Sequence, residues 1–298
     1  MSTPEPLIIC FGDILWDIFP EYKKVGGAPL NVALKLHSYG ANTYLISAVG
    51  NDALGNDLLD HLHQRGLQTQ LVQRTKKNPT GSVLVTIDDD GNAQYDIKKP
   101  AAWDSIQFSK TLEEVVKESD AFTFVSLAFR SKTSKETLDR LLKSASYKVF
   151  DVNLRAPHYN LDEVISYLQL ADLIKLNDEE LTVICRHRSF TSTDIEEQTH
   201  FIAQATRTTN VCVTLGAKGS LLLNGNQLYR HQGYKVTVKD TVGAGDSFLA
   251  SLIYKLLTHT DAEEALDYAS AVGALVASKE GANPIITEND IAKIRSGE

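Results

Sequence analysis

Short apolar runs alternate with longer segments of helical periodicity along most of this chain of 298 residues. Apolar runs of strand length lie at 7–12, 43–49, 121–128, 147–152, 171–176 and 210–215. Between them, apolar residues recur at helical spacing in 31–40, 57–66, 134–145 and 194–206. Such alternation is typical of a mostly parallel sheet with helices on both faces. We therefore expect a three-layer α/β/α fold. A capping box, Thr133 with Glu136, is expected to start the helix at 134–145.

Two segments depart from this alternation. Residues 16–25 are extended in character, and residues 81–97 hold strand-like runs on either side of Asp90-Gly91, a dipeptide typical of a hairpin turn. The acidic run 88–90 lacks the ligand spacing of a calcium loop and is interpreted as a solvated turn. We expect pieces at about 16–25 and 81–100 to form a small β-flap, or lid. Since no repeats or linkers occur, a single domain over 1–298 is expected to carry it.

The charge balance and the cysteines limit the classes of partner and compartment. A net charge of −8 argues against non-specific binding of nucleic acid or an anionic membrane. Cys10, Cys185 and Cys212 are odd in number and widely spaced, so free thiols in a reducing compartment are expected. The N-terminal stretch has no basic region before its short apolar run, and no apolar stretch is long enough to cross a membrane. A cytoplasmic protein is expected.

The segment KDTVGAGDSF, residues 239–248, places small residues and an acid directly before a helical pattern. Residues 234–240 resemble a strand, so the small residues lie at a predicted strand-to-helix junction. Small side chains there let an anion approach the unpaired amides and the positive end of the helix dipole. We therefore expect Gly243, Ala244 and Gly245 to form an anion hole.

Asp246 lies in the first turn of the same predicted helix. A carboxylate beside an anion hole can accept the proton of an attacking hydroxyl, which is the role of a general base in phosphoryl transfer. The alternative is that Asp246 only complements the helix dipole, a contribution of about 0.3–1 kcal/mol. Neither G-x-x-x-x-G-K-[ST] nor G-x-G-x-x-G occurs, so no other phosphate motif competes for the role.

Long motifs in order along the chain resemble those of the ribokinase/PfkB carbohydrate kinases. DTVGAGDSF (240–248) resembles the C-terminal motif of this family, and GGAPLNVA (26–33) resembles its N-terminal motif. Between them, DVNLR (151–155), KLNDEE (175–180) and TLGAKGS (214–220) resemble further family elements. The resemblance spans nearly the whole chain. It implies a ribokinase-like fold, ATP-dependent phosphorylation of a sugar hydroxyl, ATP and Mg²⁺ as cofactors, and Asp246 as the base.

The resemblance also implies a sugar site near the N-terminus. Gly26, Gly27 and Asn31 would line this site, with Asn31 bonding to hydroxyls; the alternative is only a flexible turn before a helix. Asp13 follows the first predicted strand, where the family has a substrate-binding acid. Asp17 is either a second sugar ligand or a surface acid on the flap.

Two arginines are candidate contacts to the substrate or to the transferring phosphate. Arg155 follows a predicted strand end and is the favoured one. For Arg130, the alternative is a loop cation paired with Glu136. Their surroundings, SLAFRSKTS and DVNLR, resemble the fructokinase branch of the family more than the ribokinases.

The nucleotide side of the site is implied by the later motifs. Asn177 and Glu180 form an N-x-x-E pair, which family members use to orient magnesium-bound water and phosphates. The same spacing is also that of a capping box, and both roles are compatible. Thr214, Gly216 and Gly219 follow a predicted strand and resemble the family's nucleotide-binding segment.

A monovalent cation near the anion hole is the remaining group that the resemblance implies. Asp240, the carbonyl of Val242, Lys279 and Gly281 match its pattern. Where some relatives carry a serine, this chain has Ile285, so potassium activation stays open.

We expect fructose as the acceptor, by resemblance alone. The alternatives are 2-keto-3-deoxygluconate, ribose or a nucleoside, and, from a different class, a catalytically silent sugar-binding regulator. The exposed edges of the lid are expected to suit a homodimer.

Overall fold

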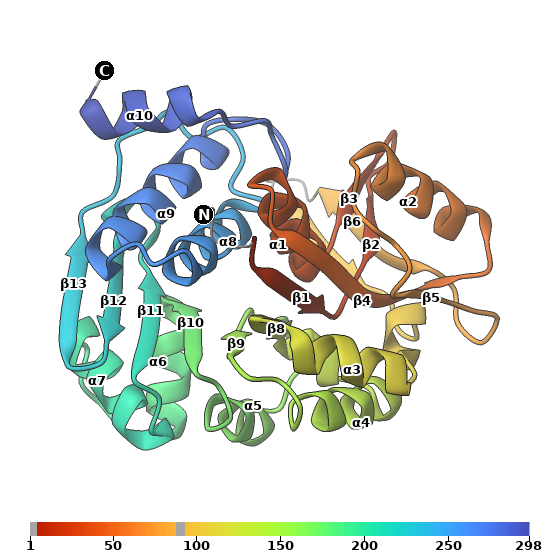
Figure 1. Ribbon diagram of the computed structural model, residues 1–298, viewed down its shortest axis with the longest axis horizontal. Coiled ribbons are helices and arrows are strands. Elements are labelled where there is room, and N and C mark those ends of the chain that lie inside the picture. Colours follow the sequence, from red (N-terminus) through yellow and green to blue (C-terminus); the bar gives the residue numbers. More distant parts are fainter. Residues whose placement is uncertain (1–4, 88–92, 298) are drawn as a thin grey trace.

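The computed structural model describes residues 5–87 and 93–297, and its middle layer is a nine-stranded sheet (Figure 1). The strand order is β13-β12-β11-β10-β9-β8-β1-β4-β5. All neighbours are parallel except β11–β12 and β12–β13, which are antiparallel. The strands are β1 (Leu7–Phe11), β4 (Asn42–Gly50), β5 (Val72–Thr75), β8 (Ala121–Val125), β9 (Lys148–Asp151), β10 (Leu173–Asn177), β11 (Asn210–Thr214), β12 (Ser220–Asn224) and β13 (Gln227–His231).

Helices cover both faces of this sheet, and Figure 1 shows α3, α4 and α5 on one side and α1, α8 and α9 on the other. The helices are α1 (Ala28–Ser38), α2 (Ala53–Gln64), α3 (Lys110–Glu118), α4 (Lys132–Leu141), α5 (Leu161–Leu168), α6 (Asp178–His187), α7 (Ile195–Thr206), α8 (Ala244–Leu257), α9 (Ala262–Ala277) and α10 (Glu288–Ser296). Short 3₁₀ turns are η1 (Ala102–Ser105), η2 (Ser126–Phe129) and η3 (Gly216–Lys218).

Successive side chains of one strand enter two separate cores, which is the physical basis of the three layers. Ile9 and Phe11 of β1 pack in the core that also contains residues of α3 to α7. Ile8 and Cys10 of the same strand pack in the core formed with α1, α2, α8 and α9. The expected α/β/α fold is confirmed, and Cys10, Cys185 and Cys212 are free and buried.

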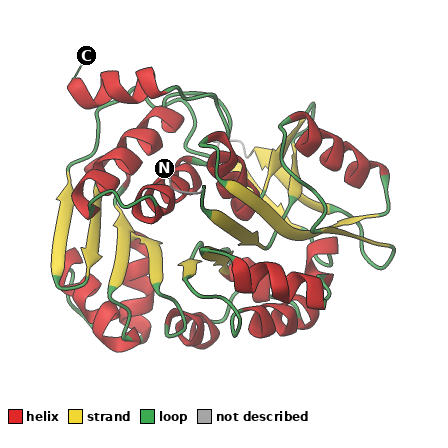
Figure 2. Cartoon of the chain, viewed as in Figure 1, coloured by secondary structure: helices red, strands yellow, loops and turns green. Residues whose placement is uncertain are grey.

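A second, four-stranded sheet has the order β3-β2-β6-β7, and its strands lie beside helix α2 in the view of Figures 1 and 2. Its strands are β2 (Leu15–Ile18), β3 (Lys23–Gly26), β6 (Gly81–Ile87) and β7 (Ala93–Ile97). Leu15, Val83 and Val85 form its small apolar core. These strands come from the two segments expected to form the β-flap. The predicted turn at Asp90-Gly91 lies outside the described residues.

Three local predictions are wrong. Residues 234–240 form no strand: after the edge strand β13 the chain leaves the sheet, and the amides of Lys239 and Asp240 bond to the carbonyl of Ala277 at the end of α9 instead. The apolar run 121–128 is strand only to Val125 and then turns as η2. Helix α4 begins one residue before Thr133, so the expected capping box does not form.

Candidate active site

The residues predicted to bind substrates gather at the carboxyl ends of the parallel strands. Asp13 follows β1, Arg155 follows β9, and Asn177 and Thr214 end β10 and β11. This is the edge where open α/β sheets bind ligands, since the connecting loops converge there.

Asp246 is joined to Asn31 across the site, although the two are far apart in sequence. Nδ2 of Asn31 donates a 2.7 Å hydrogen bond to Oδ2 of Asp246. Oδ1 of Asn31 in turn accepts a 2.7 Å bond from Nδ2 of Asn283. Helices α1 and α8 pack together through the buried residues of the second core, which brings the two motifs side by side.

The environment of Asp246 raises its pKa to about 6. The main cause is loss of hydration, and the nearby negative charge of Asp151 adds to it. The Asn31 hydrogen bond and the charges of Lys175 and Arg155 act in the opposite direction. Asp246 is therefore a base of raised proton affinity that is still ionised at neutral pH, as a general base requires.

The N-terminus of α8 is shaped by Gly243, which has a φ of 75°. An added Cβ there would collide with the backbone of Ala282, so only glycine fits. The amide of Ala244 donates to the carbonyl of Thr241, at 3.2 Å. The amides of Gly245 and Asp246 come next in the first turn, where a helix has no internal acceptor. Of the three residues expected to form the anion hole, Gly243 and Gly245 keep amides without an acceptor among the described residues, as does Asp246, whereas the amide of Ala244 is already bonded.

A buried ion pair below this helix end was missed by sequence reasoning. Nζ of Lys175 on β10 lies 3.0 Å from Oδ1 of Asp151 on the neighbouring β9. An added Cβ on Gly245 would lie 3.3 Å from the same Nζ. The attraction of Asp151, Glu180 and Asp246 raises the pKa of Lys175 despite its burial, so this lysine is a fixed positive charge next to Gly245. Its sequence signals are a charged residue within the apolar run 171–176 and a place at the start of the KLNDEE element.

Asp13 and Asp17 lie on the side of the site formed by the two glycines. An added Cβ at Gly26 would lie 2.5 Å from Oδ2 of Asp17, and one at Gly27 would lie 2.5 Å from the carbonyl oxygen of Asp13. Burial raises the pKa of each carboxyl to about 6. Asp17 is thus held against the backbone of the N-terminal motif rather than projecting from the surface of the flap.

Arg155 and Arg130 differ in their partners. Arg155 is exposed, and its positive charge lowers the pKa of Asp13, Asp17 and Asp246. Arg130 is buried and pairs with Asp104, with Nε 2.8 Å from Oδ1. The alternative pairing with Glu136 is wrong, because that carboxylate lies on the exposed surface of α4 near Lys132.

Asn177 and Glu180 form the capping box that starts α6. Oδ1 of Asn177 accepts from the amide of Glu180, and Oε2 of Glu180 accepts from the amide of Asn177. Oε1 of Glu180 also accepts from the amide of Leu154, 2.8 Å away. Each carboxylate oxygen of Glu180 keeps a second lone pair that can accept from a water molecule. The capping role of Asn177 and Glu180 is therefore compatible with a role in binding water.

The loop with Thr214, Gly216 and Gly219 connects β11 to β12. Gly216 and Gly219 have positive φ angles, and an added Cβ at Gly219 would collide with the carbonyl of His231. Around Gly216 there is open space, so this backbone is accessible at the edge of the sheet.

Asp240 ties two loops together at the end of the site. Its Oδ1 accepts from the amide of Val242 and its Oδ2 from the amide of Gly281, at 3.0 and 3.1 Å. Lys279 donates to the carbonyl of Ile285 at 2.8 Å, so its ammonium group is directed to the C-terminal segment.

Within residues 5–87 and 93–297, no group of three or more His, Cys, Asp or Glu side chains could hold a metal ion. Mg²⁺ commonly keeps several waters and binds substrate phosphates with few protein carboxylates. The buried carboxylate of Glu180 fits that mode of binding. In the part of the chain that the structure describes, no helix is long and apolar enough to cross a membrane.

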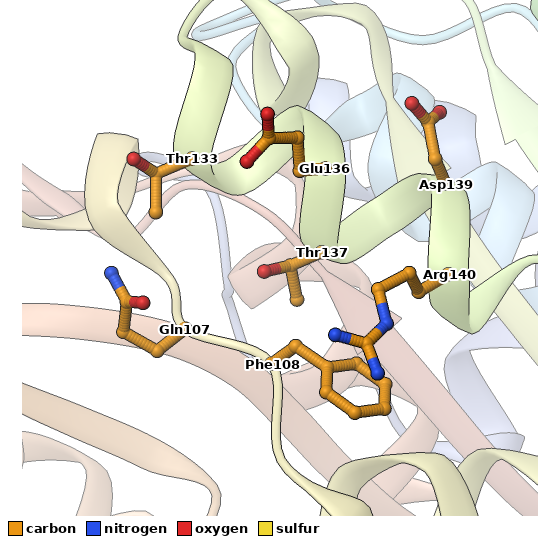
Figure 3. Close-up of a pocket in the computed structure, with 7 residues that line it drawn as sticks. All are labelled: Gln107, Phe108, Thr133, Glu136, Thr137, Asp139 and Arg140. Carbon is orange, nitrogen blue, oxygen red and sulfur yellow. The ribbon is translucent and has the colours of Figure 1, made fainter.

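A surface pocket of about 450 Å³ lies between α4 and the segment before α3 (Figure 3). Figure 3 shows Arg140 beside Phe108, with its guanidinium carbon 3.3 Å from the ring centre. Glu136 and Asp139 face the same pocket. No predicted site residue lines it, and its convergent groups are exposed charges, so it is not the candidate active site.

Comparison with known proteins identifies relatives of the whole chain. Residues 21–289 match the model of the pfkB family carbohydrate kinase. A putative sugar kinase of Pyrococcus horikoshii is 28% identical over 284 residues, which cover 92% of this chain and 87% of that protein. A fructokinase of Vibrio alginolyticus is 27% identical, covering 91% and 92%. The crystal structure of a fructokinase double mutant from Vibrio cholerae O395, with fructose, ADP and a potassium ion bound, has a TM-score of 0.85 at 24% identity and covers 99% of both chains.

Proposed function

The chain belongs to the pfkB family of carbohydrate kinases, and we propose that it transfers the γ-phosphoryl group of ATP to a primary hydroxyl of fructose. The observation that carries this proposal is the placement of Asp246 at the free amides of α8, bonded to Asn31 of the N-terminal motif. Fructokinases among the relatives favour fructose as the acceptor.

In this proposal, Asp246 takes the proton of the attacking hydroxyl. Its pKa of about 6 lets it hold that proton during transfer and release it to neutral solution afterwards. Asn31 fixes the carboxylate through Oδ2, which leaves Oδ1 for the sugar hydroxyl.

Negative charge on the transferring group would be stabilised from two directions. The amides of Gly245 and Asp246 point along the positive end of the α8 dipole. The ammonium group of Lys175 lies beside Gly245 and is held there by Asp151. The amide of Gly243 would add a further donor, whereas the amide of Ala244 is bonded to Thr241 and would not.

The sugar would lie between Asp246 and the acids Asp13 and Asp17, against the bare backbone of Gly26 and Gly27. Carboxylates accept hydroxyl protons, and glycines permit the close approach that polyol recognition needs. Arg155, whose charge reaches all three acids, would contact the substrate or the transferred phosphate.

ATP would bind along the edge formed by Thr214, Gly216 and Gly219. Asn177 and Glu180 would hold water molecules of a bound Mg²⁺ ion, since Glu180 keeps spare lone pairs. Bound Mg²⁺ neutralises phosphate charge. A potassium ion accompanies the fructokinase of Vibrio cholerae, and here a monovalent cation would be held by Asp240, the carbonyl of Val242 and the loop of Lys279 and Gly281.

The chain would act as one kinase domain over residues 1–298, with the small sheet as its lid. Closure of pieces 16–25 and 81–100 over the sugar would exclude water and limit ATP hydrolysis. Leu84 on β6 and Tyr95 on β7 are exposed, as is Tyr22 in the turn between β2 and β3. Exposed apolar side chains on the lid would suit a homodimer formed through the lids.

The direct test is ADP release with Mg-ATP and fructose, 2-keto-3-deoxygluconate, ribose, glucose, tagatose or adenosine. Highest kcat/KM with fructose supports the proposal. Highest kcat/KM with another acceptor rejects fructose and keeps the kinase chemistry. Sugar binding by calorimetry without turnover would favour a silent regulator.

A further inference from the structure

Asn283, in the loop between α9 and α10, is connected to the proposed base through one intermediate side chain. Nδ2 of Asn283 donates to Oδ1 of Asn31 at 2.7 Å, and Nδ2 of Asn31 donates to Oδ2 of Asp246 at 2.7 Å. Asn31 is only 4% exposed, so solvent offers its amide few other partners. The three side chains therefore form a chain of hydrogen bonds that ends at the carboxylate.

The direction of these bonds is set by the charge of Asp246. An ionised carboxylate only accepts hydrogen bonds, so Asn31 presents its N–H to Asp246 and its carbonyl oxygen to Asn283. Asn283 must then present its own N–H, which leaves its Oδ1 buried without a partner among the described residues. The reversed arrangement would pair that oxygen but would turn the carbonyl oxygen of Asn31 onto the carboxylate. One unpaired neutral acceptor is the smaller cost, because the alternative places an oxygen against a negative charge.

The backbone that carries this donor is held on both sides. Nη2 of Arg65, the residue after α2, donates to the carbonyl oxygen of Asn283 at 3.1 Å. Two residues earlier, the amide of Gly281 donates to the carboxylate of Asp240 at 3.1 Å. Pro284 follows Asn283 and favours an extended backbone at the residue before it. The donor amide therefore projects from a fixed backbone.

We propose that Asn283 is a positioning residue for the base: by holding the amide of Asn31, it keeps an N–H on Oδ2 of Asp246 and directs the transferred proton to Oδ1. This inference rests on the proposed function, in which Oδ1 is left for the sugar hydroxyl. A carboxylate oxygen that accepts an N–H is less basic than a free one, so the proton of the hydroxyl is taken up on Oδ1. Asn283 bonds to Asn31 and not to Asp246, so it acts through that amide.

Asn283→Leu is the sharpest test, because it removes the donor and keeps a side chain of similar size. The pKa of Asp246 would be measured by ¹³C NMR titration of the aspartate carboxyl carbons, with the signal assigned by its loss in Asp246→Asn. Asp151, Lys175 and Arg155 also act on this carboxyl, and they are unchanged in the variant. We expect the pKa to rise by about 0.3–1, as for loss of one hydrogen bond. An unchanged pKa would overturn the proposal.

Asn31→Ala supplies the matched control background, because it removes the amide between Asn283 and Asp246. Adding Asn283→Leu to this variant should leave the pKa of Asp246 where Asn31→Ala alone puts it. An equal rise in both backgrounds would show that Asn283 acts without Asn31, and would reject the positioning role. If the leucine variant does not fold, Asn283→Ala removes the same donor without adding bulk, and the same comparison is made with it.

Kinetics give a second readout that a merely structural role would not move. At a pH well above 7, where the base is ionised, Asn283→Leu should lower kcat about 3- to 10-fold and leave the KM for the sugar within twofold. A raised KM with unchanged kcat would place Asn283 in sugar binding and reject the proposal. The titration needs neither sugar nor ATP. Absence of turnover with every acceptor would therefore reject the proposed function, while the titration still decides the role of Asn283.

Discussion

Nδ2 of Asn31 donates a 2.7 Å hydrogen bond to Oδ2 of Asp246, which joins the two motifs of the chain at one carboxylate. The bond restricts the carboxylate and lowers its proton affinity, while burial raises it. The pKa of about 6 is the balance of these effects, and it sets the pH range over which stability and kcat should change.

Asp246→Asn should reduce kcat by about 10²–10⁴-fold, the usual contribution of a general base. ATP binding should persist, because the amides of α8 stay in place. Steady-state kinetics and ATP calorimetry measure the two effects. Asp17→Asn is the matched control: its carboxyl has a similarly raised pKa, but it should raise the KM for sugar more than it lowers kcat. Near-normal turnover by Asp246→Asn would refute the base.

The same substitution should alter stability with a defined pH dependence. The folded pKa of Asp246, about 6, is above the ordinary value of 3.8, so the folded state binds the proton more tightly than the unfolded state. Its contribution to the free energy of unfolding is therefore present below about pH 4 and is lost as the pH rises through 6. The thermal midpoint of Asp246→Asn relative to the original protein should increase over that interval. A flat difference would contradict the raised pKa.

Asn31→Ala should move the acid limb of the kcat profile to higher pH. Only the ionised form of Asp246 accepts a proton, so kcat should rise with pH around 6 in the original protein. Removing the Asn31 bond removes an effect that lowers this pKa, so the limb shifts upward. Asn283→Ala, which touches Asn31 but not Asp246, should shift it less. An identical limb in all three proteins would exclude this coupling.

Gly243→Ala should destabilise the fold by about 1–3 kcal/mol and abolish turnover, because it combines a positive φ with a collision against Ala282. Gly281→Ala separates these causes: φ is 77°, yet nothing lies near an added Cβ. It should show only the smaller cost of the strained backbone. Thermal unfolding and ADP release are the measurements. Equal effects at both glycines would show that the collision is unimportant.

Lys175→Met should destabilise the fold by about 3–5 kcal/mol, because Asp151 is left as an unpaired buried charge. Lys175→Met combined with Asp151→Asn removes both charges and should recover much of the stability. It should not recover kcat if Lys175 stabilises the transferring phosphate. Recovery of both would reduce Lys175 to a structural role. Chemical denaturation and kinetics on the single and double variants distinguish these outcomes.

Local patterns in the chain determined much of this protein. Apolar runs of strand length predicted the parallel strands, because each is buried on both faces, and the small residues before Asp246 marked the start of helix α8. Asn177 and Glu180 were correctly predicted as a capping box, since that contact spans only three residues.

Only the tertiary structure decided which distant groups meet. Residues 234–240 alternate like a strand but find no partner strand and bond to the end of α9. Arg130 pairs with Asp104 rather than with Glu136, which is nearer in sequence. The turn η1 brings Asp104 into a buried position against Arg130. The ion pair of Lys175 with Asp151 and the hydrogen bond of Asn31 with Asp246 likewise join residues of separate elements. Hydrogen bonds and ion pairs depend on distance in space, and packing of the two cores sets those distances.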